Sequence, residues 1–344
     1  MNKSYVIEHL IQLLNTPSPT GDTDLAINYV DDAFKALGIE TRRTLKNALI
    51  ATIPGKNDDK HRTLSAHVDT LGAMVKEVRG DGKLKITQIG GYAWSTVEGE
   101  YVTVSTQNGK TYSGTILLNQ ASTHVHGGKV NEVTRSADNL SIRLDEKVKT
   151  KDDVKKLGIE VGDFVYLDTR TTYTDSGFVK SRHLDDKACV ACLLGMAEKM
   201  VADKLTPAYT THFFISNYEE VGHGSSASLP EKTFEFLAVD MAAPGDGQTS
   251  SEYGVTICAK DSSGPYDLHL RRKLTDLAKT NEIDYNIDIY PFYGSDASAA
   301  LRAGWEIIHG LIGPGVDASH SYERLHEDSL EATIELGIKY MLAE

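Results

Sequence analysis

Helical and strand patterns alternate at both ends of this 344-residue chain, and this alternation constrains the fold more than any other feature of the sequence. Helical patterns cover residues 6–14 and 27–37, and short apolar strands are predicted at 49–53 and 62–66. The same alternation returns from residue 181 onward, with strands predicted at 209–216 and 305–309. Such alternation is typical of an α/β sheet that is covered by helices. We therefore predict an α/β fold, a mixed sheet with helices on both faces.

A region of different character interrupts this pattern between residues 71 and 172. Short strand patterns are separated there by glycine and asparagine turns. Examples are Leu84 to Ile89 followed by Gly90-Gly91, and Tyr101 to Ser105 followed by Asn108-Gly109. Frequent turns between short strands indicate a small all-β unit, a barrel or a sandwich. We predict an inserted β domain over 71–172, and a catalytic domain formed by 1–70 together with 173–344.

Charge and composition exclude several classes of partner. The net charge is −13, so we expect neither a nucleic-acid partner nor binding to an anionic membrane. The first residues, Met1 to Tyr5, lead into a helical pattern of mixed polarity and not into a signal peptide. Three cysteines without such a signal indicate a reducing cytoplasm.

Side chains that suit metal binding stand at predicted strand ends and beside a predicted helix start. They are His67, Asp69, Asp185, Glu219, Glu220, Asp240 and His320. Taken singly, each is more often a helix cap or an exposed polar residue. However, ligands gather at the carboxyl ends of strands in open α/β sheets, and zinc, cobalt and manganese accept imidazole and carboxylate. Together these residues predict a two-metal hydrolase site.

The residues also suggest how roles could be divided. Glu219 and Glu220 are adjacent, so their side chains should diverge at a strand end; one can bind a metal while the other acts as a general base. Of His67 and Asp69, one can bind metal while the other orients it. Asp185 is the natural candidate for a carboxylate that bridges two cations.

Several stretches resemble peptidase family M42, the glutamyl and deblocking aminopeptidases. They are residues 66–72, 75–77 with 90–91, 158–163, 184–186, 219–222, 239–240 and 295–297. The resemblance implies a zinc-peptidase-like domain with a barrel or PDZ-like insertion that serves oligomerisation or as a lid. It assigns one metal to His67, Asp185 and Asp240, and the other to Asp185, Glu220 and His320. It also makes Glu219 the base and Asp69 the partner of His67, and it implies a tetrahedral dodecamer.

On this basis we expect a cytoplasmic aminopeptidase that hydrolyses the N-terminal residue from peptides with a free N-terminus. It would use metal-activated water, a glutamate base and two divalent ions per subunit, zinc first and otherwise cobalt or manganese. Residues 316–323 depart from the family pattern Arg-Tyr-x-His-Ser-Pro-x-Glu, which leaves the preferred N-terminal residue open.

Two alternatives belong to other functional classes. A glycosidase would need carboxylates on opposite sides of the scissile bond, ~5–10 Å apart, which adjacent glutamates do not suggest. A non-catalytic assembly protein would be built around the β insertion. Two further motifs are open: Cys189 and Cys192, which we expect to be small buried residues, and His124 with His126, which we place in an exposed loop.

Overall fold

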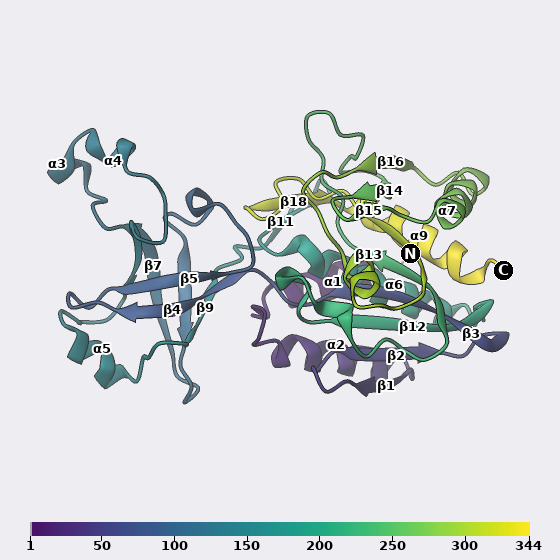
Figure 1. Cartoon of the computed structure of the whole chain (residues 1–344), viewed down its shortest axis with the longest axis horizontal. Helices are drawn as coiled ribbons and strands as arrows, with labels where there is room; N and C mark the ends of the chain where they lie inside the picture. The colour runs from purple at the N-terminus through teal and green to yellow at the C-terminus, as the bar shows by residue number, and fades with distance from the viewer. Residues whose placement is uncertain (1) are drawn as a thin grey trace. The chain divides into compact units, whose positions relative to one another are not determined.

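The chain divides into two compact units in the computed structural model, which describes residues 2–344. Met1, which the predicted catalytic domain includes, lies outside the described residues. The α/β unit comprises residues up to Thr70 and then Arg170–Glu344, and the barrel unit comprises Leu71–Thr169 (Figure 1). The second boundary was predicted at 172–173.

The α/β unit is built on a nine-stranded sheet. Its strand order is β1-β2-β12-β3-β13-β17-β14-β15, and β16 pairs with β14. The strands are β1 (Glu40–Arg43), β2 (Leu49–Ile53), β3 (Asn57–His67), β12 (Tyr209–Ser216), β13 (Thr233–Val239), β14 (Val255–Asp261), β15 (Gly264–Pro265), β16 (Tyr285–Ile289) and β17 (Ile308–Pro314). The four central strands run parallel, whereas β2 and β14 run antiparallel to their neighbours β12 and β17. The sheet is therefore mixed, as predicted.

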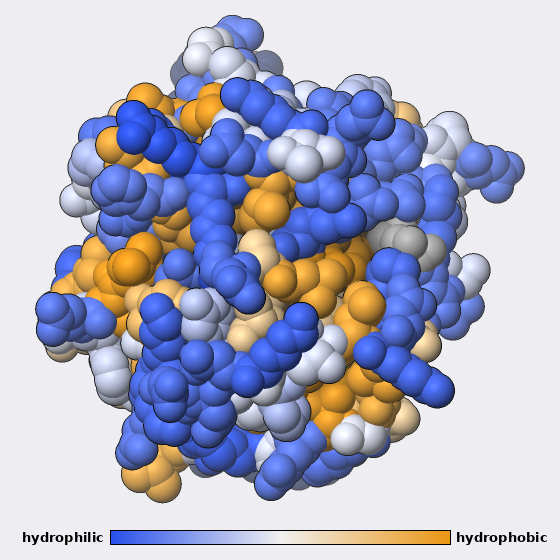
Figure 2. Space-filling view, turned by 90° about the vertical axis from the view of Figure 1, so that its right-hand side faces the viewer, coloured by the Kyte–Doolittle hydropathy of each residue, from blue (hydrophilic) through white to orange (hydrophobic). Residues whose placement is uncertain are grey.

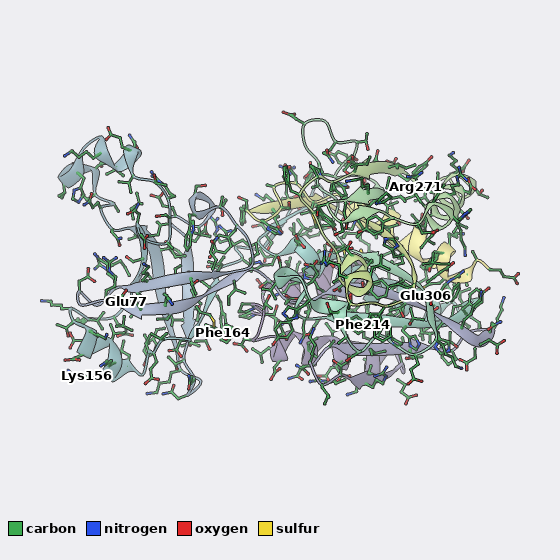
Figure 3. The ribbon with its side chains drawn as sticks, viewed as in Figure 1. Glu77, Lys156, Phe164, Phe214, Arg271 and Glu306 are labelled. Carbon is green, nitrogen blue, oxygen red and sulfur yellow. The ribbon has the colours of Figure 1, made fainter. Side chains whose placement is uncertain are left out.

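Helices cover both faces of this sheet. Alternate residues of its strands show this, because they pack into two different hydrophobic cores. In β13, Leu237 and Val239 belong to the large core that includes the buried faces of α1 (Lys3–Leu14), α2 (Asp24–Ala36), α6 (Leu184–Ala202), α7 (Leu268–Thr280) and α9 (Glu327–Leu342). The intervening Phe236 and Ala238 pack in a second core with α8 (Asp296–Arg302). Burial of both faces explains why these strands read as nearly continuous apolar runs. A smaller contact joins Phe214 of β12 (labelled in Figure 3) to Ile50 of β2.

Strand β17 was predicted in the wrong place, at residues 305–309. The reason is its two glycines, which look like turn signals in the sequence. A Cβ atom at Gly310 would lie 2.8 Å from Leu270 Cδ2, and one at Gly313 would lie 1.7 Å from the main-chain oxygen of Asp240. Gly310 thus leaves room for a side chain of α7 and Gly313 for the backbone after β13, and neither glycine marks the end of the strand.

The barrel unit confirms the predicted all-β insertion. Its closed barrel has the order β4-β5-β8-β7-β6-β9. The strands are β4 (Gly72–Val78), β5 (Leu84–Ile89), β6 (Tyr101–Ser105), β7 (Thr111–Leu118), β8 (Leu140–Leu144) and β9 (Phe164–Leu167). The unit has its own hydrophobic core, and its short helices are α3 (Thr123–His126), α4 (Lys129–Glu132) and α5 (Lys151–Leu157). His124 is exposed and His126 is partly exposed, but they lie in α3 and not in a loop.

A third sheet joins β10 (Thr172–Tyr173), β11 (Phe178–Ser181) and β18 (Glu323–His326) within the α/β unit. Hydrophilic residues dominate the face that Figure 2 shows, and hydrophobic residues appear between them in separate patches. Among the residues that the structure describes, no helix is long and apolar enough to cross a membrane.

Candidate metal centre

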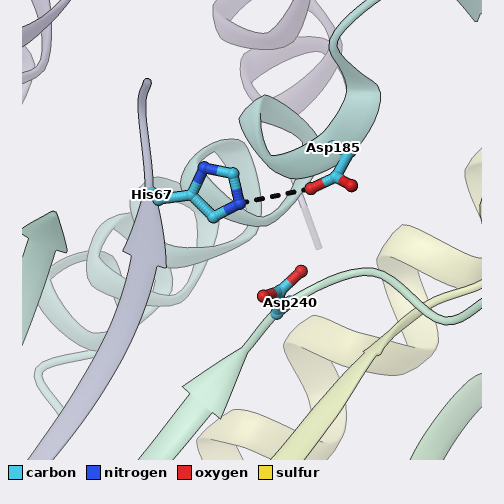
Figure 4. A group of neighbouring side chains, drawn as sticks. All are labelled: His67, Asp185 and Asp240. Atoms are coloured by element: carbon cyan, nitrogen blue, oxygen red, sulfur yellow. Dashed lines mark ion pairs between the residues drawn. The ribbon is translucent and has the colours of Figure 1, made fainter. Parts of the chain in front are cut away.

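Three of the predicted ligands meet at the carboxyl edge of the main sheet. His67 is the last residue of β3, and Asp240 directly follows the neighbouring parallel strand β13. Asp185 comes from the first turn of α6, and its Oδ1 lies 3.2 Å from His67 Nε2 (Figure 4). One donor atom from each of these three buried residues lies within 4.8 Å of the others. This is the first of the two predicted ligand sets.

The second predicted set meets on the other side of Asp185. His320 Nε2 lies 3.3 Å from Asp185 Oδ2 and 3.7 Å from Glu220 Oε2. The donors of Asp185, Glu220 and His320 again lie within 4.8 Å of one another. Asp185 therefore turns one oxygen toward each histidine, which is the arrangement that a bridging carboxylate needs.

Glu219 lies beside these donors, with its Oε2 3.6 Å from His67 Nε2. The local structure that places Glu219 there differs from the predicted strand end. Strand β12 ends at Ser216, and both glutamates stand in a 3-10 turn, η2 (Glu219–Val221), so alternation along a strand does not separate them. An open pocket of about 430 Å³ exposes both glutamates together with Asp185, Asp240 and His320.

The electrostatics of this pocket fit a cation at each set. Burial, with the charge of Asp240, raises the pKa of Glu219 well above its ordinary value against the opposing effect of His67. Burial and the charge of Asp185 raise the pKa of Glu220 as well, and they raise the pKa of Asp240 to about 7. Glu220 Oε1 is buried without a hydrogen bond to any described residue. Divalent cations would reverse these penalties and bind this oxygen.

Asp185 behaves differently from the other acids. Burial alone would raise its pKa, but hydrogen bonds from His320 and His67 outweigh burial, and the pKa of Asp185 falls below its usual range. This carboxylate is therefore the most readily ionised acid of the group, which suits contact with two cations.

Asp69 was expected to support His67 through its carboxylate, but it contacts the His67 ring through its main-chain oxygen. His67 Nδ1 lies 2.9 Å from the main-chain oxygen of Asp69, whereas the carboxylate is 3.6 Å away. The carboxylate instead accepts the backbone N–H groups of Glu219 at 3.1 Å and Glu220 at 3.3 Å, and also the hydroxyl of Thr20. Asp69 thus fixes the His67 ring through its backbone and the glutamate pair through its side chain.

Two further buried acids hold the ligands, and the sequence analysis gave them no role. The carboxylate of Glu323 accepts the backbone N–H of Asp185 at 3.1 Å and that of His320 at 3.0 Å. Asp186 Oδ2 accepts the backbone N–H of His67 at 3.1 Å. The only sequence signals were the place of Glu323 in the pattern after His320 and the adjacency of Asp186 to Asp185.

Cys189 and Cys192 lie within α6, fully buried and free. Burial raises the pKa of both thiols well above the ordinary value, which keeps them protonated and unreactive. The expectation of small buried residues is confirmed.

Comparisons with known proteins agree with this site. The family model described as M42 glutamyl aminopeptidase matches residues 47–336. The chain is 52% identical to the putative aminopeptidase YhfE of Bacillus subtilis over 335 residues, which cover 97% of this chain and 96% of the relative. It is 25% identical to the glutamyl aminopeptidase of Lactococcus lactis, over 89% of this chain and 87% of that one.

A solved structure shows the same fold. The TET1 peptidase of Pyrococcus horikoshii, described as able to assemble into a tetrahedron or a large octahedral shell, superposes with a TM-score of 0.87. The match covers 98% of this chain and all of the other, at 22% sequence identity. With the family model spanning most of the sequence and the Bacillus relative at 52% identity, the chain belongs to the M42 glutamyl aminopeptidase family of peptidases.

Proposed function

We propose that this protein is a two-metal aminopeptidase that removes the N-terminal residue of peptides. The observation that carries the proposal is the sharing of Asp185 between two donor sets, with Glu219 beside them in one open pocket. His67, Asp185 and Asp240 would hold one divalent ion, and Asp185, Glu220 and His320 the other. Zinc is the first choice for these nitrogen and carboxylate donors, and cobalt or manganese are the alternatives.

Such ions would polarise the peptide carbonyl and lower the pKa of a water molecule. Glu219 takes the proton of that water and returns it to the amine nitrogen that leaves. Its buried position suits the first transfer, because a carboxylate with a raised pKa is a stronger base. Asp69 holds Glu219 in place by accepting its backbone N–H. The adjacent placement of the glutamates in one turn gives no support to a glycosidase, which needs them on opposite sides of a bond.

We also propose that the protein is a homo-oligomer of the cytoplasm. Support for assembly comes from the fold shared with the Pyrococcus horikoshii peptidase, which forms tetrahedra. In this proposal the barrel unit contributes to assembly. Support for the compartment comes from three free cysteines, since no disulfide joins any of the described residues.

The test is a panel of aminoacyl chromogenic substrates assayed with metal-stripped protein and with zinc, cobalt or manganese added back separately. We expect chelation to abolish hydrolysis and divalent metal to restore it. Full activity in thoroughly stripped protein would refute the two-metal proposal. A blocked N-terminus on the best substrate should also abolish cleavage.

A further inference from the structure

The turn from Glu219 to Ser226 carries the proposed base and one proposed ligand, yet its shape comes from loops and not from the sheet. It consists of η2, then Gly222 in the left-handed conformation with φ of 83°, then a second 3-10 turn, η3 (Gly224–Ser226). Whatever holds this turn therefore sets where Glu219 and Glu220 lie.

Lys46 holds the turn from one side. It belongs to the loop between β1 and β2, and its Nζ lies 2.7 Å from the main-chain oxygen of His223 and 3.0 Å from that of Gly224. The Lys46 carbonyl in turn accepts Asn217 Nδ2 at 2.6 Å, just after the end of β12. The lysine is thus fixed both to the chain before the glutamates and to the chain after them.

Asp296 holds the turn from the other side and is only 3% exposed. Its Oδ1 accepts the backbone N–H of Ser225 at 2.8 Å, and its Oδ2 accepts the Ser216 hydroxyl at 2.6 Å. The Ser225 hydroxyl also donates to the main-chain oxygen of Asp296. A Cβ atom at Gly224 would lie 2.2 Å from Asp296 Oδ1, so the turn can rest on this carboxylate only because residue 224 is glycine.

Both contacts fall on one peptide group. The C=O of Gly224 and the N–H of Ser225 belong to the same planar unit and point in opposite directions when that unit is trans. Lys46 binds the first and Asp296 binds the second. A cation on the carbonyl and an anion on the amide fix both the position and the rotation of this peptide group.

We infer that Lys46 and Asp296 form a clamp on the Gly224–Ser225 peptide and are positioning residues for Glu219 and Glu220. This inference rests on the proposed function for its kinetic consequences. Neither residue is among the described residues that line the pocket, so both act through the turn. A displacement of about 1 Å at a reacting group can cost on the order of 100-fold in rate, which gives the clamp its importance.

The test compares Lys46→Met and Asp296→Asn with the wild-type protein at saturating metal. Losing a residue that supports metal ligands typically costs about 10- to 100-fold in affinity or activity. We expect kcat to fall by that factor while KM changes by less than about threefold, because the substrate pocket keeps its lining. Lys46→Arg should recover most of kcat, since a guanidinium can also donate to two carbonyl oxygens. The double variant should lose little more than either single variant, because both changes release one peptide group.

Two matched controls separate positioning from general loss of structure. Lys232 Nζ also donates to a backbone carbonyl, that of Asp58 at 2.8 Å, at the amino edge of the sheet. Asp288 is also buried and accepts three backbone N–H groups, from Thr249, Ser250 and Ile289, and the Ser250 hydroxyl. Lys232→Met and Asp288→Asn should therefore leave kcat near the wild-type value at temperatures where the protein is folded.

Calorimetric titration of metal-stripped protein with zinc supplies a readout that needs no substrate. In the two clamp variants we expect one of the two zinc ions, the one that Glu220 would bind, to bind about 10- to 100-fold more weakly, with the other little changed. The clamp would be refuted if both variants kept the wild-type kcat and the wild-type zinc affinity. It would also be refuted if the two control variants lost as much kcat as the clamp variants. If the wild-type protein cleaves no peptide, the proposed function fails, and the zinc titration alone still decides the clamp.

Discussion

Buried acids in this site fall into two groups according to what their oxygens face. Asp240 lies with Asp185 and His67, and Glu220 lies with Asp185 and His320. By contrast, backbone N–H groups are accepted by Asp69, Asp186, Asp296 and Glu323. The second group fixes the main chain that carries the first. A carboxylate that accepts backbone amides keeps its geometry whether or not a cation is nearby, so these residues prepare the site for metal.

The two adjacent glutamates should separate catalysis from metal binding. Glu219→Gln keeps the shape of the side chain but cannot accept a proton at neutral pH. We expect kcat to fall by about 100- to 10,000-fold with metal content retained. Glu220→Gln should instead lower metal occupancy, and added metal should partly rescue it. The measurement is metal stoichiometry beside kcat for both variants. Loss of metal in Glu219→Gln and its retention in Glu220→Gln would reverse the two roles.

The acids also predict how the stability of metal-free protein depends on pH. Burial raises the pKa of Asp240 to about 7 and that of Glu323 to about 8. Between about pH 6.5 and 8 the folded state holds protons that the unfolded chain has already lost, so stability falls as the pH rises. The slope is up to about 1.4 kcal/mol per pH unit for each such proton.

Calorimetric melting of chelated protein over this range should show a falling Tm, and bound zinc should flatten the dependence. The range begins at about pH 6.5, the ordinary pKa of histidine, because burial lowers the pKa of His183 and His212, which would act in the opposite direction below it. Above pH 7 one group opposes the trend, since burial lowers the pKa of Lys187 to about 7. Its single proton is outweighed by the acids, because burial also raises the pKa of Glu219 and Glu220. A Tm that rises with pH in the chelated protein would contradict this account.

At this scale the sequence predicted donors better than supports. His67, Asp185, Glu220, Asp240 and His320 carry side chains whose chemistry alone suggests metal. Lys46 and Asp296 act on a peptide group that lies far from either of them in the sequence. Acceptance of a backbone amide leaves no pattern in the sequence, because any buried carboxylate near a turn can do it. These supporting roles therefore needed the structure.

At the scale of elements, several strands were predicted with their observed bounds, whereas β17, which carries Gly310 and Gly313, was not. Residues 84–89, 101–105 and 209–216 form β5, β6 and β12 as predicted. In β17 glycine is required because Leu270 and the backbone of Asp240 come close to it. No local sequence pattern reveals these neighbours. In β17, local patterning thus failed where a helix side chain and another backbone come unusually close.

This close approach gives a prediction for β17. Gly313→Ala would place a methyl group 1.7 Å from the Asp240 carbonyl oxygen and push the end of β13. We expect a loss of about 1–3 kcal/mol in the free energy of unfolding, typical of overpacking, and weaker binding of cobalt or zinc. Gly245→Ala is the control, since nothing lies within 4 Å of a Cβ atom there. Denaturant unfolding and metal titration measure the two effects. If Gly313→Ala and Gly245→Ala had equal unfolding free energies and equal metal affinities, the end of β13 would have moved to accept the methyl group without cost.

At the scale of the whole molecule, the barrel unit is separable. Each of the two main core clusters takes its residues from one unit only. The barrel begins and ends on paired strands, since Ala73 of β4 lies opposite Val165 of β9. A short glycine-rich linker can therefore replace the residues between them. We expect the shortened protein to keep a folded α/β unit and to form smaller particles, as measured by circular dichroism and sedimentation. An unchanged large particle would exclude the barrel from assembly.

The strand order also dictates when the molecule can be completed during synthesis. Strand β3, which carries His67, is made before the barrel, yet its two neighbours β12 and β13 are made after it. Once residue 169 has been synthesised, the barrel has all its strands and can fold. Strand β3 cannot pair at that stage, because β12 and β13 have not yet been made. The second donor set gains its last member only at His320. If the two-metal proposal holds, a nascent chain lacks one of its two ion sites, and we expect no peptidase activity until synthesis has passed His320.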